Sequence, residues 1–294
     1  MMGIKTIGWV GLGAMGAPMA LAAAEAGFDV TAFDLSADQM ASVAPAVAGA
    51  ASAREAAQGK DLVGIMVATG PQLDAVLFGE GGIAEVLSPD TVVMVMATVG
   101  PDAIEKTKER LDHVTTHLVD APVSGGVLRA RKGDLLMMVS GAPEDTDLAR
   151  PVLDALASSA PVVGDVPGDG QRFKVVNQLL CGVHIAVAGE ALALADSMGL
   201  DVNQVYEVLG AGAAASFMFG DRGRRMVDGD HDEARSALDI FVKDMGIVTQ
   251  TARGVTQEAP LAAAAEQIYL RGRRQGLGRK DDSVVFRLLL GDMD

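Results

Sequence analysis

The first half of the chain alternates short, nearly continuous apolar runs with alanine-rich segments whose apolar residues recur at helical spacing. Apolar strands separated by helices are typical of a parallel sheet that is covered on both faces. The pattern therefore predicts an α/β fold with a doubly wound, mainly parallel sheet. The expected strands are Ile4–Val10, Asp29–Phe33, Leu62–Val67, Thr91–Met96, Thr116–Val119 and Leu135–Val139, and the first expected helices are Ala14–Ala26 and Ala37–Val47.

The alternation ends near Val163, and the second half shows only helical patterns. The segment Gly164–Gly170 (GDVPGDG) is rich in Gly, Pro and Asp, which makes it a natural boundary. We expect a nucleotide-binding domain at residues 1–164 and an all-α domain at residues 165–294. The all-α domain should begin with a long helix, Gln171–Met198, that ends at Gly199. Further helices are expected at Val202–Leu209, Ser216–Val227, Ala237–Thr251 and Pro260–Arg274, with Asp201 and Ser236 as N-caps.

Composition narrows the class of protein. Hydrophobic residues make up 49% of the 294 residues, so a sizeable core can be buried. The formal net charge of −15 disfavours nucleic acid and anionic membranes as partners. A single cysteine, Cys181, fits a reducing compartment. We expect a cytoplasmic protein that does not bind a membrane, because the longest apolar span, Val175–Gly189, is short for a bilayer and contains polar residues.

The first expected strand leads directly into a glycine-rich loop, Gly11-Leu12-Gly13-Ala14-Met15-Gly16. In a GxGxxG turn between a strand and a helix, the first glycine permits the tight turn and the second lets the pyrophosphate approach the backbone. The third lets the helix pack closely, and the helix N-terminus offers N–H groups to phosphate. The spacing predicts a dinucleotide site; a lone motif of this kind could also be a packing turn.

Asp34 ends the next strand and supplies a second signal for a dinucleotide. A carboxylate at this place accepts hydrogen bonds from ribose hydroxyls and repels a 2′-phosphate. NAD is therefore the expected cofactor, and NADP is disfavoured.

The loop Asp120–Gly126 (DAPVSGG) follows the strand Thr116–Val119. Ligands of open α/β sheets bind beyond the carboxyl ends of the strands. The hydroxyl of Ser124 and the N–H groups of Gly125 and Gly126 would suit a substrate carboxylate. The residues alone leave open that this is an ordinary glycine turn.

Four polar or reactive side chains share one face of the long expected helix: Lys174, Asn177, Gln178 and Cys181. Hydride transfer from an alcohol to NAD⁺ also requires the loss of the hydroxyl proton. A partly buried lysine beside the cationic nicotinamide ring would favour the neutral amine and could take that proton. The residues alone equally permit a solvated lysine at a helix start. His113 and His117 have helical metal spacing but lead into a strand, so we expect no metal site.

Four blocks resemble the β-hydroxyacid dehydrogenase family, which includes 3-hydroxyisobutyrate dehydrogenase and tartronate semialdehyde reductase. They are GLGAMGAPMA, DAPVSGG, GDGQRFKVVNQ and DIFVKD, in the family's order. The resemblance implies a Rossmann domain, a long linking helix and an all-α domain that contributes to the substrate cleft and to dimerisation. It implies a small hydroxy-acid substrate and a homodimer or homotetramer.

The resemblance also implies roles for single residues. The family's catalytic lysine corresponds to Lys174, and its substrate-binding residues to Ser124, Gly125 and Gly126. Asn177 and Gln178 would hold the hydroxyls of the substrate. The family's cofactor contacts correspond to Ala68, Thr98 in MATVGP and Lys243 in FVKD, beside the residues Gly11–Gly16 and Asp34.

Three departures from the family pattern bear on the substrate. Asn177-Gln178 replaces two asparagines, Ala97-Thr98 replaces Ser-Thr, and Met66-Val67-Ala68 replaces Met-Leu-Pro. The stretches VNQLLCGVHIAVAGEALALA and SALDIFVKDMG are most similar to the L-threonate dehydrogenase branch, which implies oxidation at C2 of a four-carbon sugar acid. The alternatives are 3-hydroxyisobutyrate oxidation, reduction of a tartronate or succinic semialdehyde, and a non-catalytic dinucleotide-binding regulator.

Overall fold

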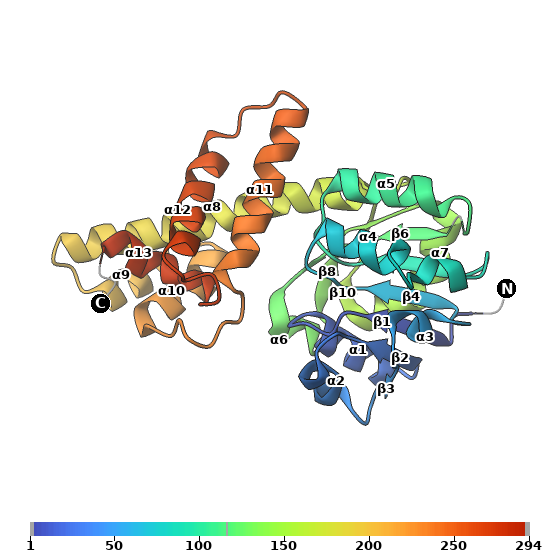
Figure 1. Cartoon of the computed structure of the whole chain (residues 1–294). Helices are drawn as coiled ribbons and strands as arrows, with labels where there is room; N and C mark the ends of the chain where they lie inside the picture. Colours follow the sequence, from blue (N-terminus) through green and yellow to red (C-terminus); the bar gives the residue numbers. More distant parts are fainter. Residues whose placement is uncertain (1–2, 116, 292–294) are drawn as a thin grey trace. The chain divides into compact units, whose positions relative to one another are not determined.

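A computed structural model describes residues 3–115 and 117–291. The chain divides into two compact units, Met1–Lys174 and Val175–Asp294. We call them the nucleotide unit and the helical unit and describe each by itself (Figure 1).

The nucleotide unit is built on an eight-stranded sheet in the order β11-β9-β6-β5-β4-β1-β2-β3. All neighbouring strands run parallel except β6 and β9, as expected for a doubly wound fold. The strands are β1 (Thr6–Val10), β2 (Asp29–Phe33), β3 (Ala48–Gly49), β4 (Leu62–Ile65), β5 (Val92–Val95), β6 (Leu118–Asp120), β9 (Val139–Ser140) and β11 (Val162–Gly164).

Helices cover both faces of this sheet, because successive strand residues point to opposite sides. Trp9 and Met94 share a buried cluster with residues of α1 and α7, whereas Val10 and Val95 share another with residues of α4 and α5. Figure 1 shows α4 and α5 on one side of the sheet and α1 on the other. The buried strands thus need apolar residues at every position, which explains their continuous apolar runs. The helices of this unit are α1 (Gly16–Glu25), α2 (Ala37–Val43), α3 (Ala53–Ala57), α4 (Gly70–Phe78), η1 (Ile83–Val86), α5 (Pro101–Leu111), α6 (Gly126–Ala130) and α7 (Pro143–Leu156).

The expected strand Leu135–Val139 is wrong as a single element. It forms two strands in two sheets, β8 (Leu135–Met137) and β9, with the break at Met138. The N–H of Met138 donates to the Pro122 carbonyl at 3.0 Å, so the chain changes partners there. β8 lies in a small sheet of order β10-β8-β7, with β7 (Val123–Ser124) and β10 (Ala157–Ser159).

The sequence pattern also missed the short strands β3, β7, β10 and β11. Segments of two or three residues are too short to display a period. The expected strand Thr116–Val119 is observed as β6, Leu118–Asp120; its residue Thr116 lies outside the described residues.

The long helix, α8 (Asp169–Ser197), begins two residues before its expected start, inside the glycine-rich segment. Gly199 has a positive φ of +73°, which confirms its predicted place just after the helix. The two units divide within this helix, between Lys174 and Val175. The first turn of α8 therefore belongs to the nucleotide unit.

α8 is long and apolar enough to span a membrane, with a mean hydropathy of 1.6. Half of its most apolar window is buried inside the structure, and a core helix of a soluble protein meets the same criteria. Length and composition alone are weak evidence for a membrane helix.

The rest of the helical unit packs around α8 through a core that includes Ile185, Leu192, Phe241, Met245 and Tyr269. The expected N-cap Asp201 is confirmed, since its side chain accepts a hydrogen bond from the Gln204 N–H at 3.0 Å. The expected N-cap Ser236 is wrong: Ala237 precedes the helix, and the Ser236 N–H donates to Asp281 instead. The helices are α9 (Val202–Gly210), α10 (Phe217–Asp228), α11 (Leu238–Gly254), α12 (Pro260–Arg274), η2 (Asp282–Val284) and α13 (Val285–Leu290).

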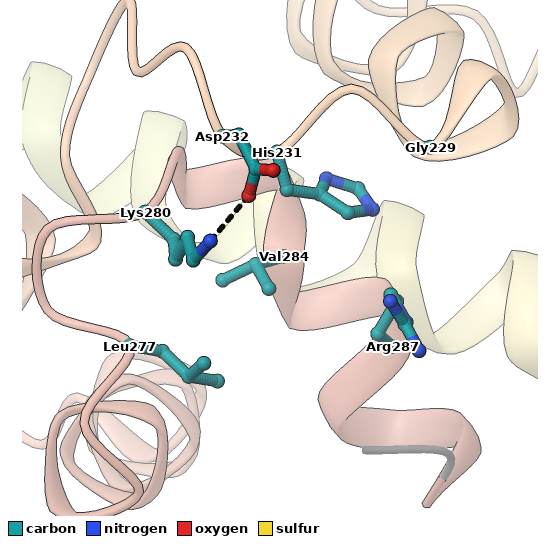
Figure 2. A pocket seen from close by; sticks show the side chains of 7 residues that line it. All are labelled: Gly229, His231, Asp232, Leu277, Lys280, Val284 and Arg287. Atoms are coloured by element: carbon teal, nitrogen blue, oxygen red, sulfur yellow. Dashed lines mark hydrogen bonds and ion pairs between the residues drawn. The ribbon is translucent and has the colours of Figure 1, made fainter. Parts of the chain in front are cut away.

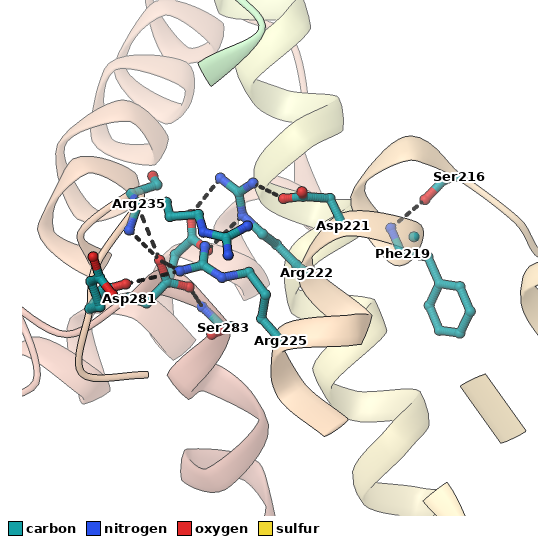
Figure 3. Close-up of polar contacts among 12 residues, drawn as sticks. Ser216, Phe219, Asp221, Arg222, Arg225, Arg235, Asp281 and Ser283 are labelled. Carbon is teal, nitrogen blue, oxygen red and sulfur yellow. Dashed lines mark hydrogen bonds and ion pairs between the residues drawn. The ribbon is translucent and has the colours of Figure 1, made fainter. Parts of the chain in front are cut away.

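A buried network of charges attaches α10 to η2 (Figure 3). The Arg222 Nε lies 2.8 Å from the Asp282 Oδ1, and the Arg225 Nη2 lies 2.5 Å from the Asp281 Oδ2. Burial raises the pKa of Asp282, whereas the Arg222 charge lowers it. Buried ions of this kind need their partners, because an uncompensated buried charge is costly.

The substitution Asp282→Asn is expected to lower the free energy of unfolding by about 3 kcal/mol, since it removes one partner of a buried ion pair. Asp239→Asn is the control, because Asp239 and its partner Arg273 are exposed. That change should cost less than about 1 kcal/mol. Urea unfolding of both variants measures the difference; equal losses would contradict the assignment of the buried pair as the stronger one.

Candidate functional site

The glycine-rich loop connects β1 to α1 as expected. Gly11 has a φ of +97°, and a Cβ at this position would lie 2.3 Å from the Met66 carbonyl oxygen. A Cβ at Gly16 would lie 2.1 Å from the Gly11 carbonyl oxygen, so α1 packs directly onto the turn. Next to Gly13 there is open space. The loop therefore has the tight turn and the open backbone that a pyrophosphate requires.

Asp34 follows β2 and fixes the same loop. Its Oδ2 accepts a hydrogen bond from the Leu12 N–H at 2.7 Å, and its Oδ1 accepts one from the Ser36 N–H at 2.8 Å. The next residue, Leu35, is 94% exposed and carries no charge. An NADP site commonly has an arginine near this place for the 2′-phosphate. The carboxylate and the neutral neighbours fit the ribose of NAD.

The loop after β4 contains Ala68, whose N–H donates to the Gln72 Oε1 at 2.8 Å. Thr69 caps α4 and forms a capping box with Gln72. The backbone at this expected cofactor contact is thus held in place by the start of α4.

The segments that follow β5 and β6 contain four more of the expected residues of the nucleotide unit. Thr98 is half-buried and directly follows Ala97, which is fully buried. Ser124 lies in β7 opposite Leu136. Gly125 and Gly126 have φ values of +139° and +76°, so this turn requires glycine.

These loops lie at one edge of the sheet. β6, β5, β4, β1 and β2 are consecutive parallel neighbours, so their carboxyl ends meet at the same edge. The structure therefore brings together the expected residues of the nucleotide unit, at the edge where open α/β sheets bind ligands.

Lys174 lies on the first turns of α8 and is only 6% exposed. This degree of burial is rare for lysine and argues against a solvated surface residue. Asn177 follows one turn later on the same face, in the part of α8 that belongs to the helical unit.

A chain of polar contacts holds the amides after Lys174. The Asn177 Nδ2 donates to the Gln178 Oε1 at 2.8 Å, and the Gln178 Nε2 donates to the Asp244 Oδ2. The Lys243 Nζ lies 2.9 Å from the Asp244 Oδ1. The expected residues Asn177, Gln178 and Lys243 therefore form one cluster of the helical unit, organised by Asp244. Sequence reasoning noted Asp244 only as part of a family pattern.

Asp120 and Gln171 are two further polar residues that sequence reasoning did not assign. Both are fully buried, and the Gln171 Nε2 donates to the Asp120 Oδ1 at 2.8 Å. The sequence offered two signals for these residues. Asp120 is a carboxylate at the end of an apolar strand, and Gln171 is an amide one helical turn before Lys174. Their pairing could not be derived, because 51 positions separate them.

Burial raises the pKa of the Asp120 carboxyl to about 6, although hydrogen bonds from Gln171, Gly168 and Ser140 lower it in part. Between about pH 4 and pH 6 the folded protein holds a proton that the unfolded chain has released. The stability contributed by this group is therefore present at low pH and lost as the pH rises through that window, by about 3 kcal/mol.

The substitution Asp120→Asn is expected to remove this pH dependence, because the amide does not titrate. Urea unfolding from pH 4 to pH 7 should show that the wild type loses about 3 kcal/mol of stability relative to the variant as the pH rises. A difference that stays constant across this range would contradict the raised pKa of Asp120.

Two other polar features contain none of the expected site residues. The His117 Nδ1 lies 2.5 Å from the Asp145 Oδ1, an acidic neighbour that the sequence did not reveal. A hollow of about 200 Å³ in the helical unit is lined by His231, Asp232, Lys280 and Arg287, among others (Figure 2). None of the expected site residues lines it, and Lys280 is paired there with Asp232.

Comparison with known proteins identifies the family. Residues 6–164 match the NAD-binding domain of 6-phosphogluconate dehydrogenase. Residues 168–289 match the family described as NAD-binding of NADP-dependent 3-hydroxyisobutyrate dehydrogenase. The chain belongs to the β-hydroxyacid dehydrogenase family. It is an NAD-dependent hydroxyacid dehydrogenase, as the resemblance of its four blocks implied.

Several relatives of this dehydrogenase are similar over nearly their whole length. L-threonate dehydrogenase of Cupriavidus necator is 41% identical over 289 residues, which cover 98% of this chain and 97% of the relative. 2-Hydroxy-3-oxopropionate reductase of Escherichia coli is 30% identical, with 96% of each chain covered. The crystal structure of 3-hydroxyisobutyrate dehydrogenase from Salmonella typhimurium has a TM-score of 0.90 and 38% identity, with 97% of this chain and 99% of that chain covered.

The family assignment agrees with the nucleotide unit of this dehydrogenase. The GxGxxG loop, the carboxylate of Asp34 and the exposed, neutral Leu35 fit NAD. The parallel sheet and the helical second unit are those of the family fold.

Proposed function

We propose that this dehydrogenase oxidises C2 of a four-carbon sugar acid such as L-threonate, with Lys174 as the group that takes the hydroxyl proton. The burial of Lys174 carries the proposal. This lysine is 6% exposed, a degree of burial that is rare for lysine, and it lies on a helix whose first turn is hydrogen-bonded to the carboxyl end of β6. Such buried titratable groups are candidates for acid–base chemistry.

The proton and the hydride leave the substrate by different routes. The Gly11–Gly16 loop and Asp34 would hold the pyrophosphate and the adenosine ribose of NAD⁺, which would supply the hydride acceptor. The neutral amine of Lys174 accepts the proton from the C2 hydroxyl as the C2–H bond breaks, which leaves a 2-oxo acid. In the reverse direction the ammonium returns the proton.

The substrate carboxylate is assigned to Ser124, Gly125 and Gly126. The hydroxyl of Ser124 and the backbone N–H groups of the two glycines are donors that suit an anion. Thr98 and Ala68 are assigned to the cofactor on the neighbouring loops, and Lys243 is assigned to it by the same family pattern.

Asn177 is assigned to the remaining hydroxyls of the sugar acid, and Gln178 to the orientation of Asn177. The hydrogen bonds of Gln178 to Asp244 and Asn177 engage both ends of its amide. The Asn177 Nδ2 is thereby directed toward Gln178, which fixes the orientation of the Asn177 amide.

The substitution Gln178→Leu tests this orientation. We expect the KM for L-threonate to rise about tenfold, which corresponds to the loss of about 1.4 kcal/mol of hydrogen bonding. The KM for NAD⁺ should stay within about twofold. Gln204→Leu, on an exposed face of α9, is the control. A Gln178→Leu enzyme with an unchanged KM for L-threonate would argue against the role.

The choice of substrate rests on similarity to L-threonate dehydrogenases such as that of Cupriavidus necator. The experiment is a screen for NADH formation over hydroxy acids and aldonic acids of three to six carbons. We expect the highest kcat/KM with L-threonate, and lower values with 3-hydroxyisobutyrate and glycerate.

Two other outcomes of the screen would each favour a different function. Rapid NADH-dependent reduction of 2-hydroxy-3-oxopropionate, with slow oxidation of L-threonate, would favour the reductase activity of the Escherichia coli relative. Tight NADH binding without turnover of any acid or aldehyde would favour a non-catalytic regulator.

We also propose a cytoplasmic homodimer or homotetramer. In support, α8 exposes apolar side chains at a seven-residue spacing, at Leu180, Val187 and Leu194, each of them more than half exposed. Contiguous exposed apolar residues typically mark protein–protein contacts. Light scattering on the purified protein gives the mass; a monomer at micromolar concentration would contradict the proposal.

A further inference from the structure

We infer that Gln171 is a positioning residue of the reaction: together with Asp120 it fixes Lys174 relative to the loops that contain Thr98 and Ser124. The inference rests on the proposed role of Lys174 and adds the residues that place it. All of the contacts involved lie within the nucleotide unit.

The side-chain amide of Gln171 is fully buried and makes four hydrogen bonds. Its Oε1 accepts from the N–H groups of Val99 and Gly100, each at 3.0 Å. Its Nε2 donates to the Ala97 carbonyl at 3.0 Å and to the Asp120 Oδ1 at 2.8 Å. Both acceptor sites of the Oε1 and both N–H groups of the Nε2 are therefore used, which fixes the orientation of the amide.

These contacts hold the backbone on both sides of Thr98. Ala97 precedes Thr98, and Val99 and Gly100 follow it. The amide of Gln171 therefore connects α8 to the two flanks of the residue assigned to the cofactor. The loop after β5 cannot shift without breaking hydrogen bonds to the helix.

Asp120 holds the start of α8 from the neighbouring strand. Its Oδ2 accepts hydrogen bonds from the N–H groups of Gly168 at 3.1 Å and Gln171 at 2.9 Å, and from the Ser140 Oγ at 3.2 Å. The Ser140 Oγ in turn accepts from the Gly170 N–H at 2.8 Å. These are donors that a helix N-terminus leaves without partners in its own backbone.

Asp120 is also the last residue of β6 and directly precedes the loop that leads to Ser124. Through Gln171 and Asp120, the first turn of α8 is therefore attached to both loops of the proposed site. Lys174 lies one helical turn after Gln171, and a helix transmits position over one turn with little flexibility. Catalytic groups need such fixed placement, since a misplacement of about 1 Å can lower a rate about 10²-fold.

The test replaces Gln171 with leucine, which has a similar volume and no hydrogen-bonding group. We expect kcat for the hydroxy acid to fall about 10- to 100-fold. The KM for NAD⁺ and the affinity for NADH should change far less than kcat, because the Gly11–Gly16 loop and Asp34 are untouched and only the backbone around Thr98 is loosened. Gln58→Leu, on the exposed end of α3, is the matched control and should leave kcat unchanged.

Gln171→Glu provides a second variant with a different signature. The glutamate keeps the acceptor for Val99 and Gly100 but places a second carboxyl beside Asp120. Two neighbouring carboxyls of this kind share a proton at low pH and repel each other when both are ionised. The ratio of kcat between this variant and the wild type should therefore rise about fivefold or more from pH 8 to pH 6. A residue that only fills space would give a constant ratio.

A third measurement does not depend on turnover. Reductive methylation followed by mass spectrometry gives the rate at which the Lys174 amine is modified. In Gln171→Leu we expect this rate to rise about fivefold or more, while the exposed Lys106 is modified at an unchanged rate. If the wild type oxidises no hydroxy acid but the rate at Lys174 rises in the variant, the proposed function fails and the positioning stands.

Two results would overturn the inference. One is an unchanged kcat together with an unchanged modification rate of Lys174 in Gln171→Leu. The other is a loss of NADH affinity in proportion to the loss of kcat, in both Gln171 variants, together with a pH-independent ratio for Gln171→Glu. That pattern would assign Gln171 to the general stability of the unit.

Discussion

Replacing Lys174 by alanine is expected to lower kcat about 10²- to 10⁴-fold, the range of a positioned acid–base group. The side chain is buried at the start of α8, and the variant removes the only amine assigned to the hydroxyl proton. NADH affinity should change by less than about twofold, because the GxGxxG loop and Asp34 are untouched. Stopped-flow turnover and fluorescence titration with NADH measure the two quantities.

Two further variants test whether the loss of kcat is specific to the amine of Lys174. Lys106→Ala, on an exposed face of α5, should retain full activity. Lys174→Arg keeps a positive charge but holds its proton at every accessible pH, so it should be as inactive as the alanine variant. Near-wild-type turnover of Lys174→Ala would end the proposed mechanism.

The double substitution Asp34→Asn with Leu35→Arg is expected to shift the ratio of kcat/KM for NADP⁺ to that for NAD⁺ about 10²- to 10⁴-fold toward NADP⁺. The change removes a carboxylate that repels the 2′-phosphate and adds a guanidinium that binds it, each with an effect of about 1.5–3 kcal/mol. The amide introduced by the first substitution still offers one acceptor for the hydrogen bond from the Leu12 N–H. Initial rates with both cofactors measure the shift.

The matched control makes the same two changes of charge outside the proposed cofactor site. Asp38→Asn with Gln39→Arg lies on α2, one turn beyond Asp34, and should leave the cofactor preference unchanged. A double variant at 34 and 35 that still prefers NAD⁺ as strongly as the wild type would show that the ribose is bound elsewhere.

The sequence predicted those features that depend on residues close together in the chain. β1, its glycine loop and Asp34 follow one another within a single strand–helix–strand unit, and their chemistry can be derived from spacing alone. The helix Pro260–Arg274 was predicted to the residue, because a proline at its first position marks its start. The catalytic role of Lys174 could be predicted only with the family resemblance, because the sequence of a helix does not show whether a lysine in it is buried.

The features that remained hidden are contacts between distant residues. Gln178 and Asp244 are separated by 66 positions, and Arg222 and Asp282 by 60. A single sequence shows which polar residues exist but not which ones meet in the core. The split of Leu135–Val139 has the same origin, because the partners on either side of Met138 decide which sheet each half joins.

The two compact units of the enzyme divide within α8, between Lys174 and Val175. The residues proposed for proton transfer, for the substrate carboxylate and for most of the cofactor contacts precede this bond, whereas Lys243 and the amides proposed for the sugar hydroxyls follow it. A chimera joined at this bond, with the second half taken from a relative that uses a different acid, should keep the chemistry of its first half and acquire the substrate preference of its second. Divergence of substrate within such a family can then proceed by changes in one gene segment while the reaction itself is preserved.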